Sequence, residues 1–125
     1  MKHRIVRILL LVAMIGLTPM VAYANQYREV SLGAKVANSD LVIIGQVIST
    51  SSSDCLNLFS CATVKINTRL KGSEVSTVKV LFHGPIAEED PICCKVGATY
   101  VFFLTHARNG YYVSVNGPYG IYQTN

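Results

Sequence analysis

The sequence predicts a mainly β domain, a five-stranded OB-like closed barrel with a short N-terminal helix and disulfide-stapled loops. Three observations support this class. Short segments rich in β-branched and aromatic residues recur between turn signals, several of them alternate apolar and polar residues, and 4 cysteines lie in a chain of 125 residues. The segments follow one another as a meander, a long connection and a hairpin, which favours a barrel that leaves no long edge open. A small β-sandwich is the alternative.

The first predicted strand, residues 40–48, is the longest unbroken apolar run after the N-terminal segment. Its β-branched residues fit a pleated, packed surface. Gly45 lies in its middle, where a strand interior normally avoids glycine. We therefore expect a bulge, a sharp bend or a barrel corner at Gly45.

A short amphipathic helix is expected ahead of this strand, within residues 25–39. Val30, Ala34 and Ala37 recur at spacings of four and three residues, and Asn38 is suited to end a helix. These three residues would form its apolar face.

Four more strands are expected at residues 62–70, 77–82, 99–105 and 111–115. In the first of them, Ala62, Val64, Ile66 and Leu70 share one face. The strand 99–105 is apolar on both faces, so the N-terminal helix is the natural cover for its second face. Asn109-Gly110 predicts a type I′ hairpin turn, because both central positions of that turn need positive φ.

The first 24 residues are expected to be a secretory signal peptide, which leaves residues 25–125 as a single OB-like domain. A basic start, the apolar run 8–17 and the small-x-small site Ala22-Tyr23-Ala24 occur in the order typical of such a leader. The apolar run is shorter than the roughly 20 residues of a membrane span, and Pro19 follows it. We expect no integral membrane span after cleavage, and a secreted or periplasmic (extracytoplasmic) protein.

Most of the excess positive charge belongs to this leader. It holds Lys2, Arg4 and Arg7, so the mature chain keeps 8 of the 11 basic residues and all 7 acidic residues. The mature net charge is therefore near +1. This near-neutral balance gives no indication of a nucleic-acid partner.

The four cysteines, Cys55, Cys61, Cys93 and Cys94, are expected to form two disulfides, as an even count in a small exported chain favours. Pairing Cys55 with Cys61 would leave Cys93 to bond its direct neighbour, and a vicinal bridge strains the intervening peptide. We therefore favour two cross-links between the two cysteine-bearing loops, in a register that the sequence leaves open. The other pairing also stays open.

One candidate binding surface is a basic stripe on the outer face of the strand 62–70. Lys65 and Arg69 lie on this face, and Lys71 follows them. OB folds bind single-stranded nucleic acid through such grooves, but export and the mature charge argue against that use. A solvated strand face is the ordinary alternative, and anionic glycans, lipid headgroups or a protein would be the ligands.

Two further candidate binding positions are apolar or aromatic. Leu58 and Phe59, in the loop between Cys55 and Cys61, either pack beneath the disulfides or form an exposed contact patch, and packing is favoured. Tyr119 lies among glycine and proline residues, where we expect it to be exposed for binding, since tyrosine is common at interfaces.

The sequence indicates no catalytic or metal site. His83 and His106 lack ligand spacing typical of zinc when they are combined with Cys93 and Cys94. The carboxylates at residues 88–90 lie on an irregular connection, without the fixed geometry that acid–base catalysis needs. We expect no cofactor, no metal and no enzymatic activity.

Several stretches together resemble a known family. The chain resembles the netrin-like OB domain of the tissue inhibitors of metalloproteinases and their short bacterial secreted relatives. The resemblance is carried by residues 38–47, by the turn Leu70-Lys71-Gly72 and by residues 96–104, which cysteines shortly precede. The resemblance extends over roughly residues 30–121 and implies the barrel fold. Tissue inhibitors chelate the protease zinc through an N-terminal cysteine, whereas this mature chain would begin Asn25-Gln26-Tyr27. The resemblance therefore implies the fold without that inhibitory mechanism.

These observations predict an exported, non-enzymatic binding module for a protein partner. A protease is one such partner, and the chain would then be an inhibitor-like protein without the zinc-chelating cysteine. The alternative is an envelope structural protein, or a glycan- or lipid-binding protein, that uses the basic stripe and the tyrosines.

Overall fold

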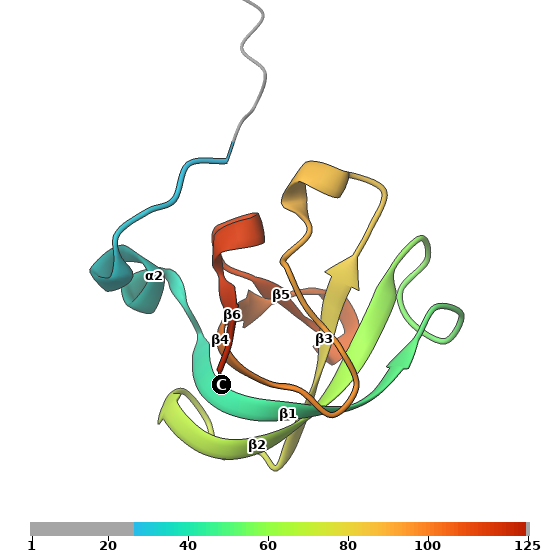
Figure 1. The fold of residues 1–125 in the computed structure, drawn as a ribbon, viewed down its shortest axis with the longest axis horizontal. Helices are drawn as coiled ribbons and strands as arrows, with labels where there is room; N and C mark the ends of the chain where they lie inside the picture. The colour runs from blue at the N-terminus through green and yellow to red at the C-terminus, as the bar shows by residue number, and fades with distance from the viewer. Residues whose placement is uncertain (1–26, 125) are drawn as a thin grey trace, which may run out of the picture.

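The computed structural model describes residues 27–124, in which the strands close into a barrel (Figure 1). The strands are β1 (Leu41–Ser51), β2 (Ser60–Lys71), β3 (Thr77–His83), β4 (Thr99–His106), β5 (Tyr112–Ser114) and β6 (Ile121–Gln123). The helical elements are α2 (Leu32–Asn38) and the short 3-10 turns η1 (Ala87–Glu89), η2 (Arg108–Gly110) and η3 (Gly117–Tyr119). The predicted signal peptide lies outside the described residues.

The barrel closes in the order β1-β2-β3-β5-β4, and β4 pairs back onto β1. Every pair in this ring is antiparallel except β3 and β5, which run parallel. The predicted five-stranded OB-like closed barrel is therefore confirmed over the sandwich. A sixth strand, β6, was not expected. It pairs with β4 beyond β5, so that both short strands lie along the same edge of β4.

Gly45 marks an irregularity in β1, as the sequence predicts. The pairing of β1 with β2 shifts register between Ile44 and Gly45. A Cβ atom at Gly45 would lie 2.5 Å from Cγ1 of Val64 and 2.9 Å from the carbonyl oxygen of Lys65. Glycine is therefore required here because β2 approaches β1 too closely for a side chain.

The barrel interior is filled by the inward-facing residues of the strands. Its fully buried members include Ile43, Val47, Val64, Val80, Phe102 and Leu104. The predicted alternation holds in β2 as far as Ile66, whereas Leu70 is 61% exposed. The reason is that β3 pairs with β2 only from Ser60 to Lys65, so the last residues of β2 project beyond the ring.

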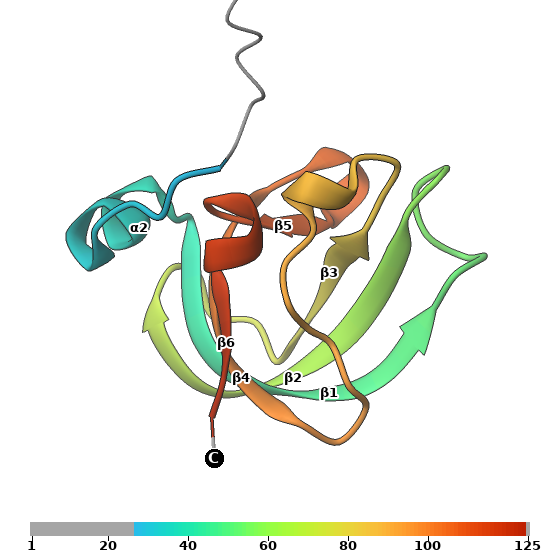
Figure 2. The same ribbon diagram turned by 45° about the horizontal axis from the view of Figure 1, so that its top comes forward.

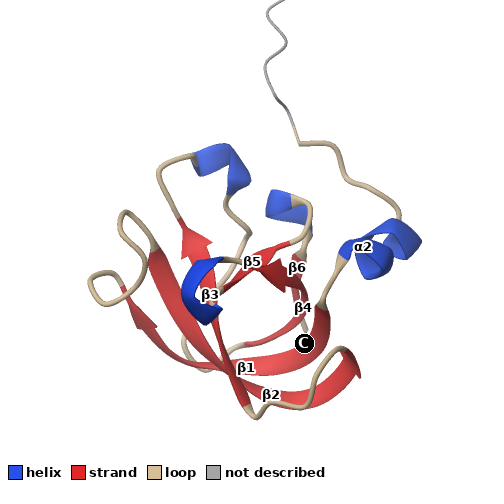
Figure 3. Ribbon diagram, turned by 180° about the vertical axis from the view of Figure 1, so that it is seen from behind, coloured by secondary structure: helices blue, strands red, loops and turns tan. Residues whose placement is uncertain are grey.

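The helix differs from its predicted orientation. α2 begins at Leu32, where the backbone N–H of Ala34 donates to Oγ of the capping residue Ser31 at 3.2 Å. Val30 and Ala37 are exposed, and the buried residue of the helix is Lys35, which is only 3% exposed. The expected apolar face is therefore wrong. α2 stands beside the barrel in all views (Figures 1 and 3).

Lys35 is buried because it has polar partners. Its Nζ donates to Oε1 of Glu29 at 2.9 Å and contacts the hydroxyl of Tyr122, which itself donates to Glu29 at 2.9 Å. Burial acts to lower the pKa of Lys35, but the hydrogen bonds with Tyr122 and Glu29 outweigh burial and raise it. The helix is thus attached to β6 by a polar cluster.

α2 contacts β4, as expected, but the second apolar face of β4 also has other neighbours. Phe103 packs with Val42 of β1 and with Val115, and the ring of Tyr122 lies edge-on to Phe103 at 6.4 Å between centroids. Val42 lies beside Phe103 on the paired strand β1, and the segment that contains β6, a strand absent from the prediction, adds to the cover.

The hairpin between β4 and β5 has the predicted turn. Asn109 and Gly110 have φ angles of 56° and 77°, and the N–H of Tyr111 donates to the carbonyl of Arg108 at 3.2 Å. Positive φ at both central residues is the property of a type I′ turn.

All four cysteines form disulfides, but in the pairing that the sequence disfavoured. Cys55 bonds Cys61, and Cys93 bonds its neighbour Cys94. The expected cross-links are wrong. The β1–β2 hairpin pairs Ser51 with Cys61, so Cys55 and Cys61 lie close together at the two ends of one short loop. Cys94 instead packs into the barrel interior. Disulfides persist in oxidising compartments, which is consistent with an extracytoplasmic protein. The helices of residues 27–124 lack the length and apolar character of a membrane span.

Candidate functional site

The parallel pair of β3 and β5 carries apolar side chains on the outside of the barrel. Leu81 pairs with Val113, and both follow residues, Val80 and Tyr112, that belong to the interior cluster. Because strand side chains alternate, Leu81 and Val113 face outward. Leu81 is nevertheless only 4% exposed, although it belongs to neither of the two core clusters. Something outside the barrel therefore covers it.

Phe59, at the end of the β1–β2 loop, lies against these outward residues. Its ring packs over Gly84, where a Cβ atom would lie 2.5 Å from Cε1 of the ring. The disulfide between Cys55 and Cys61 closes the loop that carries Phe59. The hydroxyl of Tyr111 also donates to the carbonyl of Asp54 at 3.3 Å, which ties the loop to the residue before β5.

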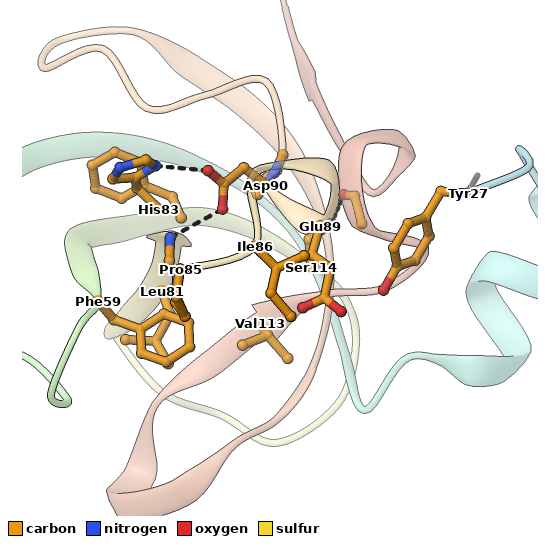
Figure 4. Close-up of a pocket in the computed structure, with 14 residues that line it drawn as sticks. Tyr27, Phe59, Leu81, His83, Pro85, Ile86, Glu89, Asp90, Val113 and Ser114 are labelled. Carbon is orange, nitrogen blue, oxygen red and sulfur yellow. Dashed lines mark hydrogen bonds and ion pairs between the residues drawn. The ribbon is translucent and has the colours of Figure 1, made fainter. Parts of the chain in front are cut away.

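Two hollows lie on either side of this ring, and we call them together the β3–β5 groove. Phe59, Leu81 and Val113 line both hollows. The first, with a cavity volume of about 230 Å³, extends towards η1 and η3 and is also lined by Tyr27, His83, Ile86, Glu89 and Ser114 (Figure 4). The second, of about 430 Å³, extends towards η2 and is also lined by Leu56, Asn57, Ala107 and Arg108.

Polar contacts stabilise the edge of the β3–β5 groove that is formed by the connection between β3 and β4. Nδ1 of His83 lies 2.6 Å from Oδ2 of Asp90, whose second oxygen accepts the backbone N–H of Gly84 at 3.0 Å (Figure 4). The carboxylate of Asp90 thus closes the turn that follows β3. Figure 2 shows η1, in the same connection, beside η3, and the two turns are in contact.

Tyr27 forms the other edge of the first hollow. A Cβ atom at Gly117 would lie 3.1 Å from the Tyr27 ring, so the ring rests on the bare backbone of η3. Partial burial, followed by the nearby negative charge of Glu89, raises the pKa of the Tyr27 hydroxyl. Asn116 fixes the segment behind Tyr27, since its side-chain amide accepts from Val30 N at 2.9 Å and donates to Arg28 O at 2.8 Å.

Of the exposed apolar side chains in this region, Ile86 lines the first hollow, whereas Leu58 lines neither hollow and adjoins the groove only through Phe59. Leu58 is 74% exposed and precedes Phe59, while Ile86 is 51% exposed and points towards Val113 (Figure 4). The two candidate residues predicted in the cysteine loop, Leu58 and Phe59, therefore differ in exposure. Phe59 packs, as favoured from the sequence, and Leu58 is exposed.

The predicted basic stripe is not a continuous free cationic surface. Lys65 is exposed. Arg69 contacts the carbonyl of Gly72 and pairs with the Glu74 carboxylate at 3.2 Å. Nζ of Lys71 donates to the Val36 carbonyl at 2.8 Å, at the C-terminal end of α2. Two of the three basic side chains are thus engaged within the protein.

Tyr119 is half-buried in η3, so the expectation that it is exposed is wrong. Its backbone N–H donates to the Asn116 carbonyl at 3.0 Å, within a turn that packs against η1. Tyr122 is the more exposed tyrosine in this part of the chain, but its hydroxyl belongs to the cluster with Lys35 and Glu29.

The polar groups of the β3–β5 groove are mostly paired with one another. Ser114 donates its hydroxyl to the Gly117 carbonyl at 2.6 Å, and the carboxylate of Asp90 is occupied by His83 and Gly84. Across residues 27–124, no three His, Cys, Asp or Glu side chains gather closely enough to hold a metal ion. What the groove offers to a ligand is apolar surface with charges at its ends.

Sequence reasoning missed most of this groove. Ile86, Glu89 and Arg108 lie in connections with no periodic pattern. One signal was available, because Leu81 interrupts the alternation of the strand that contains Val78 and Val80 and places an apolar side chain on its outer face. The sequence matches no protein-family model, and a search of curated proteins finds no significant match.

Proposed function

We propose that this chain is an exported, non-enzymatic binding module that engages a protein partner through the β3–β5 groove. The observation that carries the proposal is that exposed Ile86 lines a preformed apolar hollow, whose wall residue Phe59 directly follows exposed Leu58 in the chain. Binding hot spots concentrate where apolar side chains enter well-packed, desolvated pockets. Large exposed apolar side chains that are grouped at a hollow are typical of interaction sites.

The loops that form this groove are fixed at both sides, which favours tight binding. The Cys55–Cys61 disulfide restrains the loop with Leu58, and the contacts of Asp90 restrain the connection with Ile86. A restrained surface loses less conformational entropy on association. Binding rather than catalysis is proposed because Ser114 and Asp90 use their polar atoms inside the protein.

Proteases are the partner class that we propose to test first. Support comes from the netrin-like resemblance together with an OB-like barrel that follows a short helix. Because the mature chain would lack an N-terminal cysteine, inhibition would have to use the loops of the groove. Export is supported by the leader-like first 24 residues and by the disulfides. Intact-mass measurement of the exported protein would contradict export with cleavage if its N-terminus were not Asn25.

The test is an inhibition and binding screen of the purified, oxidised protein against metalloproteases and serine proteases. Ile86→Asp and Leu58→Asp are expected to weaken binding of any protease found by about tenfold or more, because a charge replaces an apolar anchor. Leu70→Asp is the matched control, since the exposure of Leu70 lies between those of Leu58 and Ile86 and Leu70 lies on β2, outside the residues that line the groove. Equal affinities for all three variants and the wild type would overturn the role of the groove.

Glycan or lipid binding through the basic stripe is the second candidate function. It is less favoured, because Arg69 and Lys71 are engaged within the protein. Its test is titration with envelope polysaccharide and with anionic vesicles, comparing wild type with Lys65→Ala/Arg69→Ala. Binding that is unchanged in the double variant would exclude the stripe.

A further inference from the structure

We infer that the β3–β5 groove recognises an extended polypeptide segment in which an apolar side chain lies between a basic and an acidic residue. The inference rests on the proposed function and specifies the partner chemistry of the same site. The apolar side chain would enter one of the two hollows, both of which are lined by Phe59, Leu81 and Val113. The two flanking charges follow from the charged side chains at the two ends of the groove.

The end of the groove near η1 is negatively charged. Glu89 lines the first hollow on the side away from Phe59 (Figure 4). The neighbouring Glu88 is exposed. Among the described residues, neither carboxylate takes part in an ion pair. Asp90 and His83 also lie here, but they contact each other at 2.6 Å. A basic side chain of a ligand would therefore meet the carboxylate of Glu89, which lies beside the Tyr27 hydroxyl, with exposed Glu88 next to it in the chain.

The opposite end, near η2, carries a positive charge. Arg108 lines the second hollow, is exposed, and forms no ion pair with any of residues 27–124. The type I′ turn of Asn109 and Gly110 follows it directly, so the backbone of Arg108 is held in a defined position. A guanidinium group at this place offers a fork of donors that suits a carboxylate.

Charges of both signs at the ends of an apolar floor favour a polypeptide over other ligands. An anionic glycan or an anionic lipid surface would be attracted to Arg108 but repelled by Glu88 and Glu89. A polypeptide segment supplies a cation, an apolar side chain and an anion within a few residues. Complementary charges at the rim mainly set specificity and orientation, while the apolar anchor supplies most of the affinity.

The experiment is selection of a random linear peptide library, displayed on phage, against the immobilised, oxidised protein. We expect enriched sequences with Lys or Arg on one side of an apolar residue and Asp or Glu on the other, in a constant direction. Dissociation constants are then measured for one enriched peptide. Ile86→Asp is expected to weaken binding about tenfold or more, and Glu89→Lys or Arg108→Glu about two- to fivefold each, as exposed charge pairs do.

The decisive variant is the charge exchange Glu89→Lys/Arg108→Glu. It is expected to prefer the peptide in which the basic and acidic residues have been exchanged. Glu74→Lys and Lys95→Glu make the same charge changes on exposed side chains that do not line the groove, and are expected to leave both affinities unchanged. Circular dichroism of every variant confirms that the fold is retained.

Three outcomes would overturn the inference. Enriched peptides that require Ile86 but show no charge pattern would remove the charge specificity and leave the proposed function standing. An absence of enriched peptides, together with a protease or other protein that still requires Ile86, would show that the groove does not take linear segments. A dimer of the protein alone, detected by sedimentation and lost in Ile86→Asp, would identify a second copy of the chain as the occupant.

Discussion

The barrel interior and the β3–β5 groove are both apolar, but they differ in how their residues are placed. The interior is built from alternating strand residues such as Val47, Val64 and Phe102, which the closed ring removes completely from water. The groove combines the outward residues Leu81 and Val113 with loop residues, and leaves Ile86 at its mouth half in solvent. The first region therefore stabilises the fold, whereas the second leaves apolar surface exposed to solvent.

The largest expected effect comes from emptying the interior. Phe102 is fully buried at the centre of the interior cluster. Phe102→Ala should lower the free energy of unfolding by about 3–5 kcal/mol, because it removes apolar contacts and leaves a cavity. Urea unfolding followed by circular dichroism measures this change. A loss below 1 kcal/mol would contradict the tight packing assigned to the interior.

The next effect comes from overfilling the interior wall. Gly45→Ala places a Cβ atom 2.5 Å from the side chain of Val64, so we expect a loss of about 1–3 kcal/mol in unfolding free energy. Gly33→Ala is the matched control, because a Cβ atom there has no neighbour within 4 Å. Helix propensity predicts that the control is neutral or slightly stabilising. Equal losses in the two variants would count against close approach at Gly45.

The disulfide in the β1–β2 loop acts on both regions. Cys55→Ser/Cys61→Ser should lower the unfolding free energy by about 2 kcal/mol, since a short loop is no longer closed in the unfolded chain. It should also weaken binding of any groove ligand, because Leu58 and Phe59 would be less restrained. A double variant that lost stability but kept full affinity would show that the loop needs no covalent support to bind.

A smaller effect is expected from acid. Oδ2 of Asp40 accepts the N–H of His106 at 2.9 Å and the hydroxyl of Thr105 at 2.7 Å, and these bonds lower the pKa of Asp40 below its ordinary value. A lowered folded-state pKa contributes stability above the unfolded pKa, near 3.9, which is lost as pH falls through the folded pKa. Asp40→Asn should therefore flatten the decline of stability below about pH 4. Identical pH profiles for the two proteins, from urea midpoints, would contradict this.

The interior could be predicted from the sequence because its signals are local. Three features can each be recognised from neighbouring residues in the sequence: the alternation in β2, the turn at Asn109-Gly110 and the glycine inside a strand, Gly45. The orientation of α2 could not be predicted. Lys35 is buried because it bonds Glu29 and Tyr122, and Tyr122 lies near the far end of the chain. The vicinal disulfide was disfavoured by local geometry and depends on where the loops lie in the fold.

The groove could not be predicted from the sequence for the same physical reason. Leu81 and Val113 meet only because β3 and β5 run parallel when the barrel closes, and no local pattern specifies that pairing. The short strand β6, of 3 residues, also carries too little periodicity to be predicted from the sequence. Charged residues in connections, such as Glu89 and Arg108, acquire a role only after this closure.

The most direct test of the central claim is to measure affinity and stability together in Ile86→Asp, with Leu70→Asp as the control. The ligand is the protease or peptide that the wild-type protein binds. We predict that Ile86→Asp weakens binding about tenfold or more while its unfolding free energy stays within about 0.5 kcal/mol of wild type. Leu70→Asp should change neither quantity. Unchanged affinity in a folded Ile86→Asp protein would contradict the assignment of the β3–β5 groove as the binding site.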